Sequence, residues 1–229
     1  MNVRGTGAGT GPVAANSPTV LVDFRLYLVT DRHATRGRRL PDLVECCLQA
    51  GLRAVQLREK DLGARELLAL ARELRILTSR HGARLLVNDR IDVAMAAGAD
   101  GVHLPSEALP PDVARPLIGP ARLLGVSTHS ASEAEVAERA GADFVLFGPV
   151  YDTPAKRRYG APQGLAALAE VCRRVSLPVV AIGGVTAAHV PELRAAGAAG
   201  IAVIRALLRA ADPARATAEL LAACGEAWR

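Results

Sequence analysis

Aromatic side chains are scarce in this chain of 229 residues: only 3% are Phe, Trp or Tyr, although 50% are hydrophobic. The core must therefore be built from Ala, Val, Leu and Ile, which suits buried parallel strands covered by Ala-rich helices. Few aromatics also leave little for nucleic-acid bases to stack on, and the net charge of +5 comes mostly from dispersed arginines. We expect no nucleic acid among the partners.

Cysteines and long apolar runs are also few. The four cysteines include the adjacent pair Cys46 and Cys47 and show no metal-ligand spacing, so we expect reduced thiols in the core. No apolar stretch approaches the ~20 residues that span a bilayer, and the N-terminus lacks the basic and apolar regions of a signal peptide. We therefore expect a cytoplasmic protein with no membrane partner.

The length fits one folded domain, because barrels and doubly wound sheets of about 200 to 250 residues commonly form a single domain. Residues 1–20 are rich in Gly, Thr, Ala and Pro without periodicity, and we expect them to form a disordered, mobile tail. Residues 21–229 would then form the catalytic domain.

Short apolar runs alternate with longer amphipathic ones through residues 21–229. The helical patterns include residues 64–80 and 130–140, the second with Ser130 or Ser132 as its N-cap. Several helices end at a glycine that the next strand closely follows, namely Gly51, Gly98, Gly141 and Gly197. Eight strands are predicted, at residues 25–30, 54–57, 84–88, 101–104, 123–127, 144–148, 178–183 and 200–204. This repetition favours a closed (β/α)₈ TIM barrel over an open sheet.

Polar side chains gather at the predicted strand ends. In such a barrel the C-terminal ends of the strands and the loops after them form the active face, so residues far apart in the sequence should meet there. In strand order these residues are Gln56, Arg58, Lys60 and Asp61; Asn88 and Asp89; His103, Ser106 and Glu107; Ser127 and His129; Thr153 and Lys156; Gly183 and Gly184; and Ile204 and Arg205.

Cations, hydroxyls and backbone amides dominate this set, which suits phosphorylated small molecules. Arg58, Lys60 and Lys156 come from different strand ends and would converge on phosphate oxygens through charge-assisted hydrogen bonds. Gly183 and Gly184 precede a predicted helix, whose N-terminus offers amides and a positive dipole end to a second phosphate. The pattern predicts a polyphosphate substrate and a second phosphorylated molecule.

One carboxylate and two histidines have a possible chemical role. Asp89 among these cations would suit Mg²⁺, which takes carboxylate and phosphate oxygens together, although an Asn-Asp pair before a helix could instead cap that helix. His103 lies within an apolar strand and is typical of a core histidine or of one that supports a neighbouring side chain. His129 follows a strand end and could exchange protons near neutral pH.

Five stretches carry a family resemblance: VQLREKD, VNDRIDVAMAAGADGVHL, GVSTHS, GADFVLFGPVYDTPAKR and VVAIGGV, in this order along the chain. Together they resemble the thiamine-phosphate synthase family and the closely related thiazole tautomerases. The resemblance implies a TIM barrel that couples hydroxymethylpyrimidine diphosphate to a thiazole phosphate and releases pyrophosphate, with Mg²⁺ as the cofactor. It also implies that catalysis is largely electrostatic, with cations stabilising charge on the departing pyrophosphate.

The resemblance further implies a role for each matched residue. Gln56 matches the glutamine that contacts the pyrimidine, and Asp89 matches one of two Mg²⁺-binding aspartates. The implied pyrophosphate ligands are Arg58, Lys60, Asn88 and Lys156, the hydroxyls near the substrates are Ser127 and Thr153, and the thiazole-phosphate amides are Gly183 and Gly184. We also expect Ile204 and Arg205, after the eighth strand, to bind substrate.

Two positions depart from the synthase pattern. Ala108 stands where the synthases carry their second metal-binding aspartate, which leaves Glu107 as the predicted substitute, and Ala155 stands where they carry a second threonine. The turn after the fourth strand is more like that of the tautomerases, in which a histidine matching His129 acts as acid and base. Lys60 and Asp89 favour the synthase. A tautomerase and a non-catalytic barrel that binds a phosphorylated ligand stay as alternatives, and a homo-oligomer is compatible with the sequence.

Overall fold

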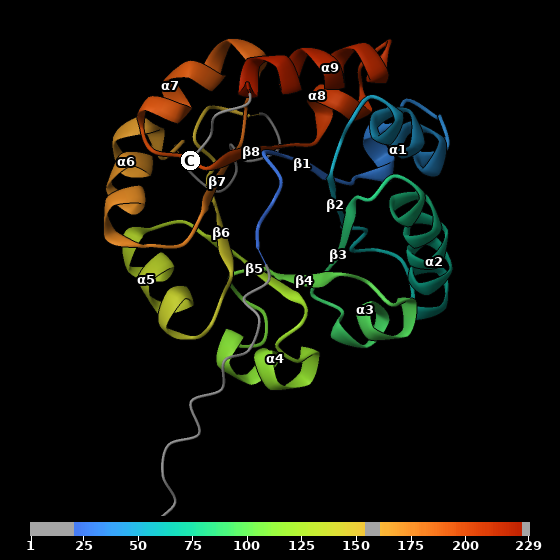
Figure 1. Cartoon of the computed structure of the whole chain (residues 1–229), viewed down its shortest axis with the longest axis horizontal. Helices are drawn as coiled ribbons and strands as arrows, with labels where there is room; N and C mark the ends of the chain where they lie inside the picture. The colour runs from blue at the N-terminus through green and yellow to red at the C-terminus, as the bar shows by residue number, and fades with distance from the viewer. Residues whose placement is uncertain (1–20, 154–160, 226–229) are drawn as a thin grey trace, which may run out of the picture.

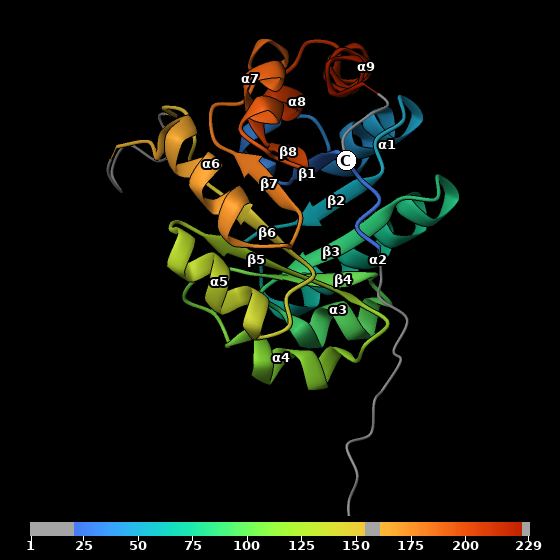
Figure 2. The ribbon, with the colours of Figure 1, turned by 60° about the vertical axis from the view of Figure 1, so that its left-hand side comes forward.

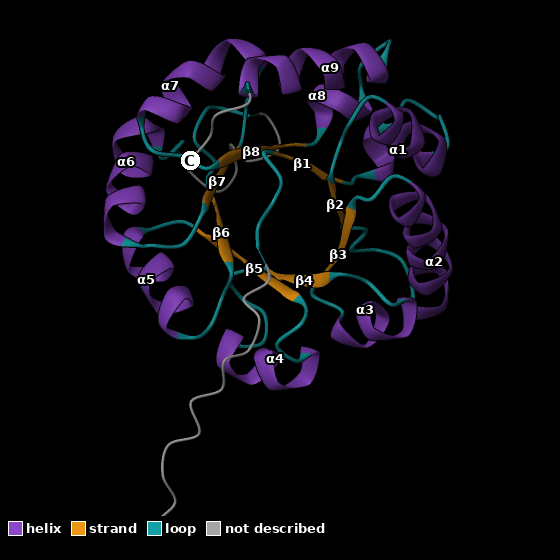
Figure 3. Cartoon of the chain, in the orientation of Figure 1, coloured by secondary structure: helices purple, strands orange, loops and turns teal. Residues whose placement is uncertain are grey.

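Eight parallel strands close into a barrel in the computed structural model, which describes residues 21–153 and 161–225. Each strand pairs with the next in chain order, and the last strand pairs with the first (Figures 1 and 3). The strands are β1 Leu26–Val29, β2 Ala54–Leu57, β3 Arg84–Asn88, β4 Gly101–Leu104, β5 Leu123–Thr128, β6 Phe144–Phe147, β7 Val179–Ile182 and β8 Gly200–Val203. The predicted (β/α)₈ barrel is confirmed.

Helices surround this barrel and cover its outer surface (Figure 2). They are α1 Leu40–Gln49, α2 Ala64–Arg80, α3 Ile91–Ala97, α4 Pro111–Ile118, α5 Ala131–Arg139, α6 Gly164–Arg174, α7 Val190–Ala195, α8 Arg205–Leu208 and α9 Pro213–Cys224, with short 3₁₀ turns at η1 Arg32–Ala34 and η3 Ala187–His189. The helix predicted over residues 64–80 matches α2 at both ends. Ser130 is the N-cap of α5, because its side chain accepts a hydrogen bond from the Glu133 amide.

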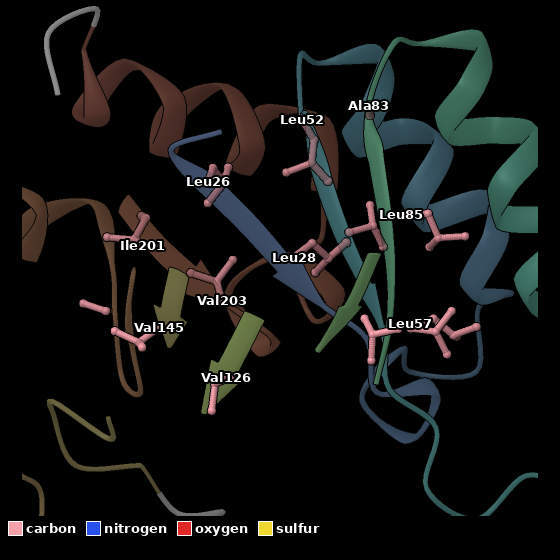
Figure 4. Close-up of a cluster of buried hydrophobic side chains, with 14 of the residues drawn as sticks. Leu26, Leu28, Leu52, Leu57, Ala83, Leu85, Val126, Val145, Ile201 and Val203 are labelled. Atoms are coloured by element: carbon pink, nitrogen blue, oxygen red, sulfur yellow. The ribbon is translucent and has the colours of Figure 1, made fainter. Parts of the chain in front are cut away.

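The larger part of the core lies between the strands and the helices. Side chains such as Leu28, Leu57, Leu85 and Val203 point outward from their strands and are almost completely buried (Figure 4). The helices meet them with one apolar face, and in α2 that face is made by buried residues spaced three or four apart: Leu67, Ala71, Leu74 and Leu77. Ala, Leu and Val therefore build this layer, as the composition predicts.

A second cluster fills the interior of the barrel, made by the alternate side chains of the same strands. It includes Tyr27, Leu86, Phe144 and Ala202. Residues two positions further along point the same way, so the inward face continues past Leu86 to Asn88 at the C-terminal rim. By the same alternation, Gln56, His103 and Ser127 also belong to the inward face.

Three further sequence predictions concern the backbone, the cysteines and the membrane. The four glycines predicted to follow helices, Gly51, Gly98, Gly141 and Gly197, all have positive φ angles. All four cysteines are free thiols. Within residues 21–153 and 161–225, no helix combines the length and apolarity needed to cross a bilayer. The predicted tail, residues 1–20, lies outside the residues that the structure describes.

Candidate active site

A cavity of about 220 Å³ lies between the β2–α2 and β3–α3 connections. It brings together Lys60, Asn88 and Asp89, which the sequence places on two different strand ends. The complete lining is Glu59, Lys60, Leu62, Leu67, Asn88, Asp89, Arg90 and Pro105. One ammonium, one amide and a carboxylate from the predicted set therefore share a single cavity.

Asp89 has a backbone conformation that is uncommon for a residue with a side chain, with φ at +67°. Its amide donates to the carbonyl oxygen of His103 over 2.9 Å, which continues the β3–β4 pairing one residue past the end of the strand. The N-cap of α3 is Arg90, and it makes no side-chain capping bond. The helix-capping interpretation of Asn88 and Asp89 is therefore wrong, and Asp89 presents an exposed carboxylate at the rim.

The side chains of Arg58 and Lys60, at the end of β2, make no hydrogen bond or ion pair within the described residues. Several exposed arginines also have no such partner within the described residues, whereas Arg115 contacts Asp143 over 2.7 Å and Arg174 contacts Glu135 over 2.7 Å. Arg58 is half-buried, and its backbone amide is anchored to the Thr30 hydroxyl over 2.8 Å. An unpaired cation at the mouth of a barrel favours an anionic ligand.

Glu59 is a cavity residue that sequence reasoning missed. Its side chain is only 2% exposed, and its carboxylate accepts the backbone amide of Arg32 over 3.0 Å. The Arg32 guanidinium then reaches Asp61, which His33 also contacts, and the hydrogen bond from Arg32 is the main cause that lowers the pKa of Asp61. Glu59 and Asp61 form hydrogen bonds with the β1–α1 connection and thereby hold the segment of Arg58 and Lys60 in place. Their carboxylates are therefore not free to bind a ligand.

The oxygen donors at this cavity fit Mg²⁺. Asp89 supplies a carboxylate that makes no hydrogen bond or ion pair within the described residues, and Asn88 supplies a neighbouring amide oxygen. A hard ion that keeps waters and takes phosphate oxygens needs few protein ligands. No group of three or more His, Cys, Asp or Glu side chains suited to a metal occurs within residues 21–153 and 161–225. Glu107 is exposed on the turn after β4 and is not among the lining residues, so its metal role stays a prediction.

Inside the rim, two polar pairs connect predicted site residues to the barrel interior. Gln56 donates from its amide to the hydroxyl of Tyr27 over 3.2 Å, and burial raises the pKa of that tyrosine. Ser127 and His103 contact each other, with 2.9 Å between Oγ and Nε2. Burial, followed by the nearby charge of Arg58, lowers the pKa of His103 to about 3. His103 is thus the interior, supporting histidine that the sequence predicts.

His129 lies just past the end of β5, half-buried, with its ring oriented by the neighbouring strand. Its Nδ1 is 2.5 Å from the carbonyl oxygen of Gly148, a contact that assigns the proton to Nδ1. The backbone amide of His129 donates to Glu133 over 2.7 Å. Nε2 is then the ring atom that can accept a proton, so this histidine has the form that acid–base chemistry requires.

Gly183 and Gly184 make a tight turn directly after β7, with φ angles of +102° and +66°. A Cβ on Gly183 would lie 2.6 Å from Pro149, and one on Gly184 would lie 2.7 Å from the carbonyl oxygen of Asp152. The turn therefore packs backbone against backbone, and neither glycine amide donates to an acceptor in the described part of the chain. The following helix begins as the 3₁₀ turn η3 and continues as α7.

The other predicted residues follow β6 and β8. Thr153 and Ile204 are half-buried after these two strands, and Arg205 is the exposed first residue of α8. Lys156 falls within residues 154–160, outside the residues that the structure describes, so its place at the site stays a prediction.

In the part of the chain that the structure describes, a closed (β/α)₈ barrel carries cations, a carboxylate and glycine amides without protein partners at its C-terminal face. These features define a class: barrel enzymes that act on phosphorylated small molecules. Comparison with known proteins identifies the family within that class. Residues 26–207 match the family described as "Thiamine monophosphate synthase". This chain belongs to that family, and the resemblance noted in the sequence is confirmed.

Three relatives illustrate the similarity. A Geobacter sulfurreducens protein that carries the provisional name of a thiamine-phosphate synthase is 55% identical over 201 residues, which cover 88% of this chain and 94% of that protein. The thiamine-phosphate synthase of Roseiflexus castenholzii is 47% identical over 195 residues, 85% of this chain and 86% of its own. The solved structure of thiamine phosphate pyrophosphorylase from Pyrococcus furiosus superposes with a TM-score of 0.81 at 38% identity, covering 89% of this chain and 96% of that one.

Proposed function

We propose that this protein is a transferase that joins hydroxymethylpyrimidine diphosphate to a thiazole phosphate, forming thiamine phosphate and releasing pyrophosphate. The observation that carries the proposal is the cavity shared by Lys60, Asn88 and Asp89, in which the Lys60 ammonium and the Asp89 carboxylate make no hydrogen bond or ion pair within the described residues. This arrangement suits a diphosphate, whose oxygens need cations, and a metal ion, which needs a carboxylate. The family membership supports the same reaction.

The reaction begins when the carbon–oxygen bond between the pyrimidine methylene and the diphosphate breaks. Arg58 and Lys60 hold the departing pyrophosphate and stabilise the negative charge that develops on it, and Lys156 is proposed to join them. Fixed charges on Arg58 and Lys60 would need little reorganisation during the step, unlike the dipoles of bulk water. Mg²⁺, when bound at Asp89 and Asn88, would supply further neutralisation of that charge.

The pyrimidine end of the substrate would lie deeper in the barrel, beside Gln56. Because the Gln56 amide nitrogen donates to Tyr27, its side-chain orientation is fixed and its carbonyl oxygen is left to accept from the substrate's amino group. The thiazole phosphate would bind across the mouth at the amides of Gly183 and Gly184, near Ile204 and Arg205. Its ring nitrogen then attacks the pyrimidine cation.

One observation favours a second candidate, a thiazole tautomerase that aromatises the thiazole phosphate. The ring of His129 is oriented through Nδ1 and presents Nε2 as a proton acceptor, as a proton-transfer catalyst requires. The cavity lined by Lys60, Asn88 and Asp89 does not favour that reaction, because aromatisation involves no diphosphate that would need such a site. A phospholigand-binding barrel without turnover is the remaining alternative.

The discriminating experiment supplies the purified protein with Mg²⁺ and both phosphorylated precursors. We expect thiamine phosphate and pyrophosphate in equal amounts. His129→Ala should keep most of this coupling, because ionisation depends on fixed charge rather than on proton transfer. Aromatisation of the thiazole tautomer without coupling, abolished in His129→Ala, would establish the tautomerase instead. Saturable binding without any product would establish the binding barrel.

A further inference from the structure

His103 is a polar side chain sealed inside the barrel. It is 0% exposed, and the rings of Tyr27 and Phe144 pack around it at centroid distances of 6.0 and 5.8 Å. Gly125 on the neighbouring strand makes room for it, because a Cβ there would lie 2.6 Å from His103 Nδ1 and 2.3 Å from Phe144. The His103 imidazole fits inside the barrel only because position 125 on β5 is a glycine.

The two ring nitrogens of His103 have different surroundings. Nε2 lies 2.9 Å from the Ser127 hydroxyl, whereas Nδ1 is buried and has no hydrogen-bond partner within the described residues. A proton on Nδ1 would leave a buried N–H donor without an acceptor, which is the rarer and more costly defect. The proton therefore belongs on Nε2, which donates to the Ser127 oxygen.

We propose that His103 is a positioning residue that fixes Ser127 as a hydrogen-bond donor to the substrate. With its oxygen occupied by His103 Nε2–H, the Ser127 hydroxyl directs its own hydrogen toward the open C-terminal end of the barrel. The group it meets there must be an acceptor, either a phosphate oxygen or a ring nitrogen with a lone pair. This proposal rests on the proposed function, in which Ser127 lies beside the substrates.

The same geometry argues against Ser127 as an activated nucleophile. A histidine that deprotonates serine must become positively charged, and in catalytic triads a carboxylate on the other ring nitrogen stabilises that charge. His103 Nδ1 faces Gly125 and has no such carboxylate among the described residues, while Arg58 lies near enough to disfavour the charged ring. With no group at Nδ1 to stabilise the charged ring, His103 orients the Ser127 hydroxyl and does not remove its proton.

The kinetic test is a double-mutant cycle. His103→Leu and Ser127→Ala should each lower kcat/KM by about tenfold to a hundredfold, the range for losing one hydrogen bond to a charged group. The double variant should be no worse than the poorer single variant, because both changes remove the same hydrogen bond. His103→Gln, whose amide N–H can reach the position of Nε2, should recover most of the loss. Independent, multiplying losses, or a His103→Gln variant as poor as His103→Leu, would overturn the proposal.

A matched control separates positioning from loss of packing. Leu123 lies inside the barrel at the opposite end of β5, so Leu123→Ala perturbs the same strand without touching Ser127. We expect the effects of Leu123→Ala and Ser127→Ala on kcat/KM to multiply. Thermal unfolding of every variant shows which ones are folded at the assay temperature.

A spectroscopic measurement tests the tautomer without relying on the reaction. In wild-type protein with ¹⁵N-labelled histidine, the His103 signals are those that disappear in His103→Gln. We expect the pattern of a neutral ring with the proton on Nε2, because only Nε2 has a hydrogen-bond partner within the described residues. A proton on Nδ1, or an imidazolium at neutral pH, would overturn the proposal. Absence of coupling activity in the wild type would instead contradict the proposed function. The spectrum would still show whether the His103 proton lies on Nε2, as this proposal requires.

Discussion

The backbone amide of Asp89 donates a hydrogen bond to the carbonyl oxygen of His103 over 2.9 Å. This bond ties the proposed metal ligand to the strand that carries the proposed positioning residue. Asp89 then turns into the left-handed region, with φ at +67°, and its carboxylate leaves the sheet for the cavity that Lys60 also lines. Few residues with a side chain adopt this conformation apart from Asn and Asp, and such backbone outliers are concentrated at functional sites.

Substitutions at Asp89 should separate backbone strain from metal binding. Asp89→Asn keeps the left-handed backbone, which Asn tolerates, but removes the charge, so the Mg²⁺ needed for half-maximal rate should rise by about tenfold or more. Asp89→Gly also lacks the carboxylate and should show the same increase in the Mg²⁺ requirement. Asp89→Ala should have a free energy of unfolding about 1 kcal/mol lower than Asp89→Gly, because Ala is strained in the left-handed conformation and Gly is not. Metal titrations of the rate and urea unfolding check both expectations. An unchanged Mg²⁺ requirement in Asp89→Asn would remove the metal role.

Lysine chemistry offers a direct probe of the diphosphate site. Lys60 and Lys156 are the only two lysines in the sequence, and every other strong base is an arginine. An amine-directed reagent should therefore inactivate the enzyme by modifying few positions, and inorganic pyrophosphate with Mg²⁺ should protect Lys60. Peptide mass mapping measures the modification at each amine. Equal modification of Lys60 with and without pyrophosphate would show that the ligand binds elsewhere.

The glycine turn after β7 can be tested against a glycine of similar φ in open space. Gly82 has φ at +59°, and a Cβ there would meet nothing within 4 Å, whereas Gly184, at +66°, would place a Cβ 2.7 Å from the Asp152 carbonyl oxygen. We expect Gly82→Ala to cost about 1 kcal/mol through strain alone and to keep the KM for the thiazole phosphate. Gly184→Ala should be less stable and should raise that KM. Equal KM values in the two variants would contradict the predicted phosphate site.

Acid should destabilise the fold through His103. Burial lowers the pKa of this histidine from 6.5 to about 3, so between these pH values the unfolded chain binds a proton that the folded chain excludes. The free energy of unfolding therefore falls as the pH drops below 6.5, by at most about 1.4 kcal/mol per pH unit from this residue. His103→Gln lacks this contribution, so the stability of wild type relative to the variant should decline toward acid. Urea unfolding across this range provides the measurement, and parallel pH curves would refute the burial argument.

Much of the fold was predictable because each apolar run in the sequence forms a strand and the polar residues after it mark the strand's C-terminal end. Residues 84–88 and 101–104 match β3 and β4 at both ends. Lys60 and Asp89 could also be placed together in advance, since the C-terminal ends of neighbouring parallel strands meet at one rim. In these cases local pattern and global fold agree, which allows prediction from sequence.

The remaining features depend on tertiary contacts that no local pattern encodes. Glu59 lies in a charged stretch typical of a solvated loop, and its burial requires Arg32 from a connection 27 positions earlier. The positive φ of Asp89 depends on the bond to His103, and the contact of His103 with Ser127 depends on the register that pairs His103 with Gly125. The sequence indicates which residues carry the chemistry, and the structure is needed to find what holds them in place.

The most direct measurement of the central claim is a crystal structure of the protein with Mg²⁺ and inorganic pyrophosphate. We predict that the pyrophosphate lies against Arg58 and Lys60 at the C-terminal rim, with the metal bridging it to the carboxylate of Asp89. A pyrophosphate bound away from both cations, or a metal that leaves Asp89 without a contact, would contradict the account.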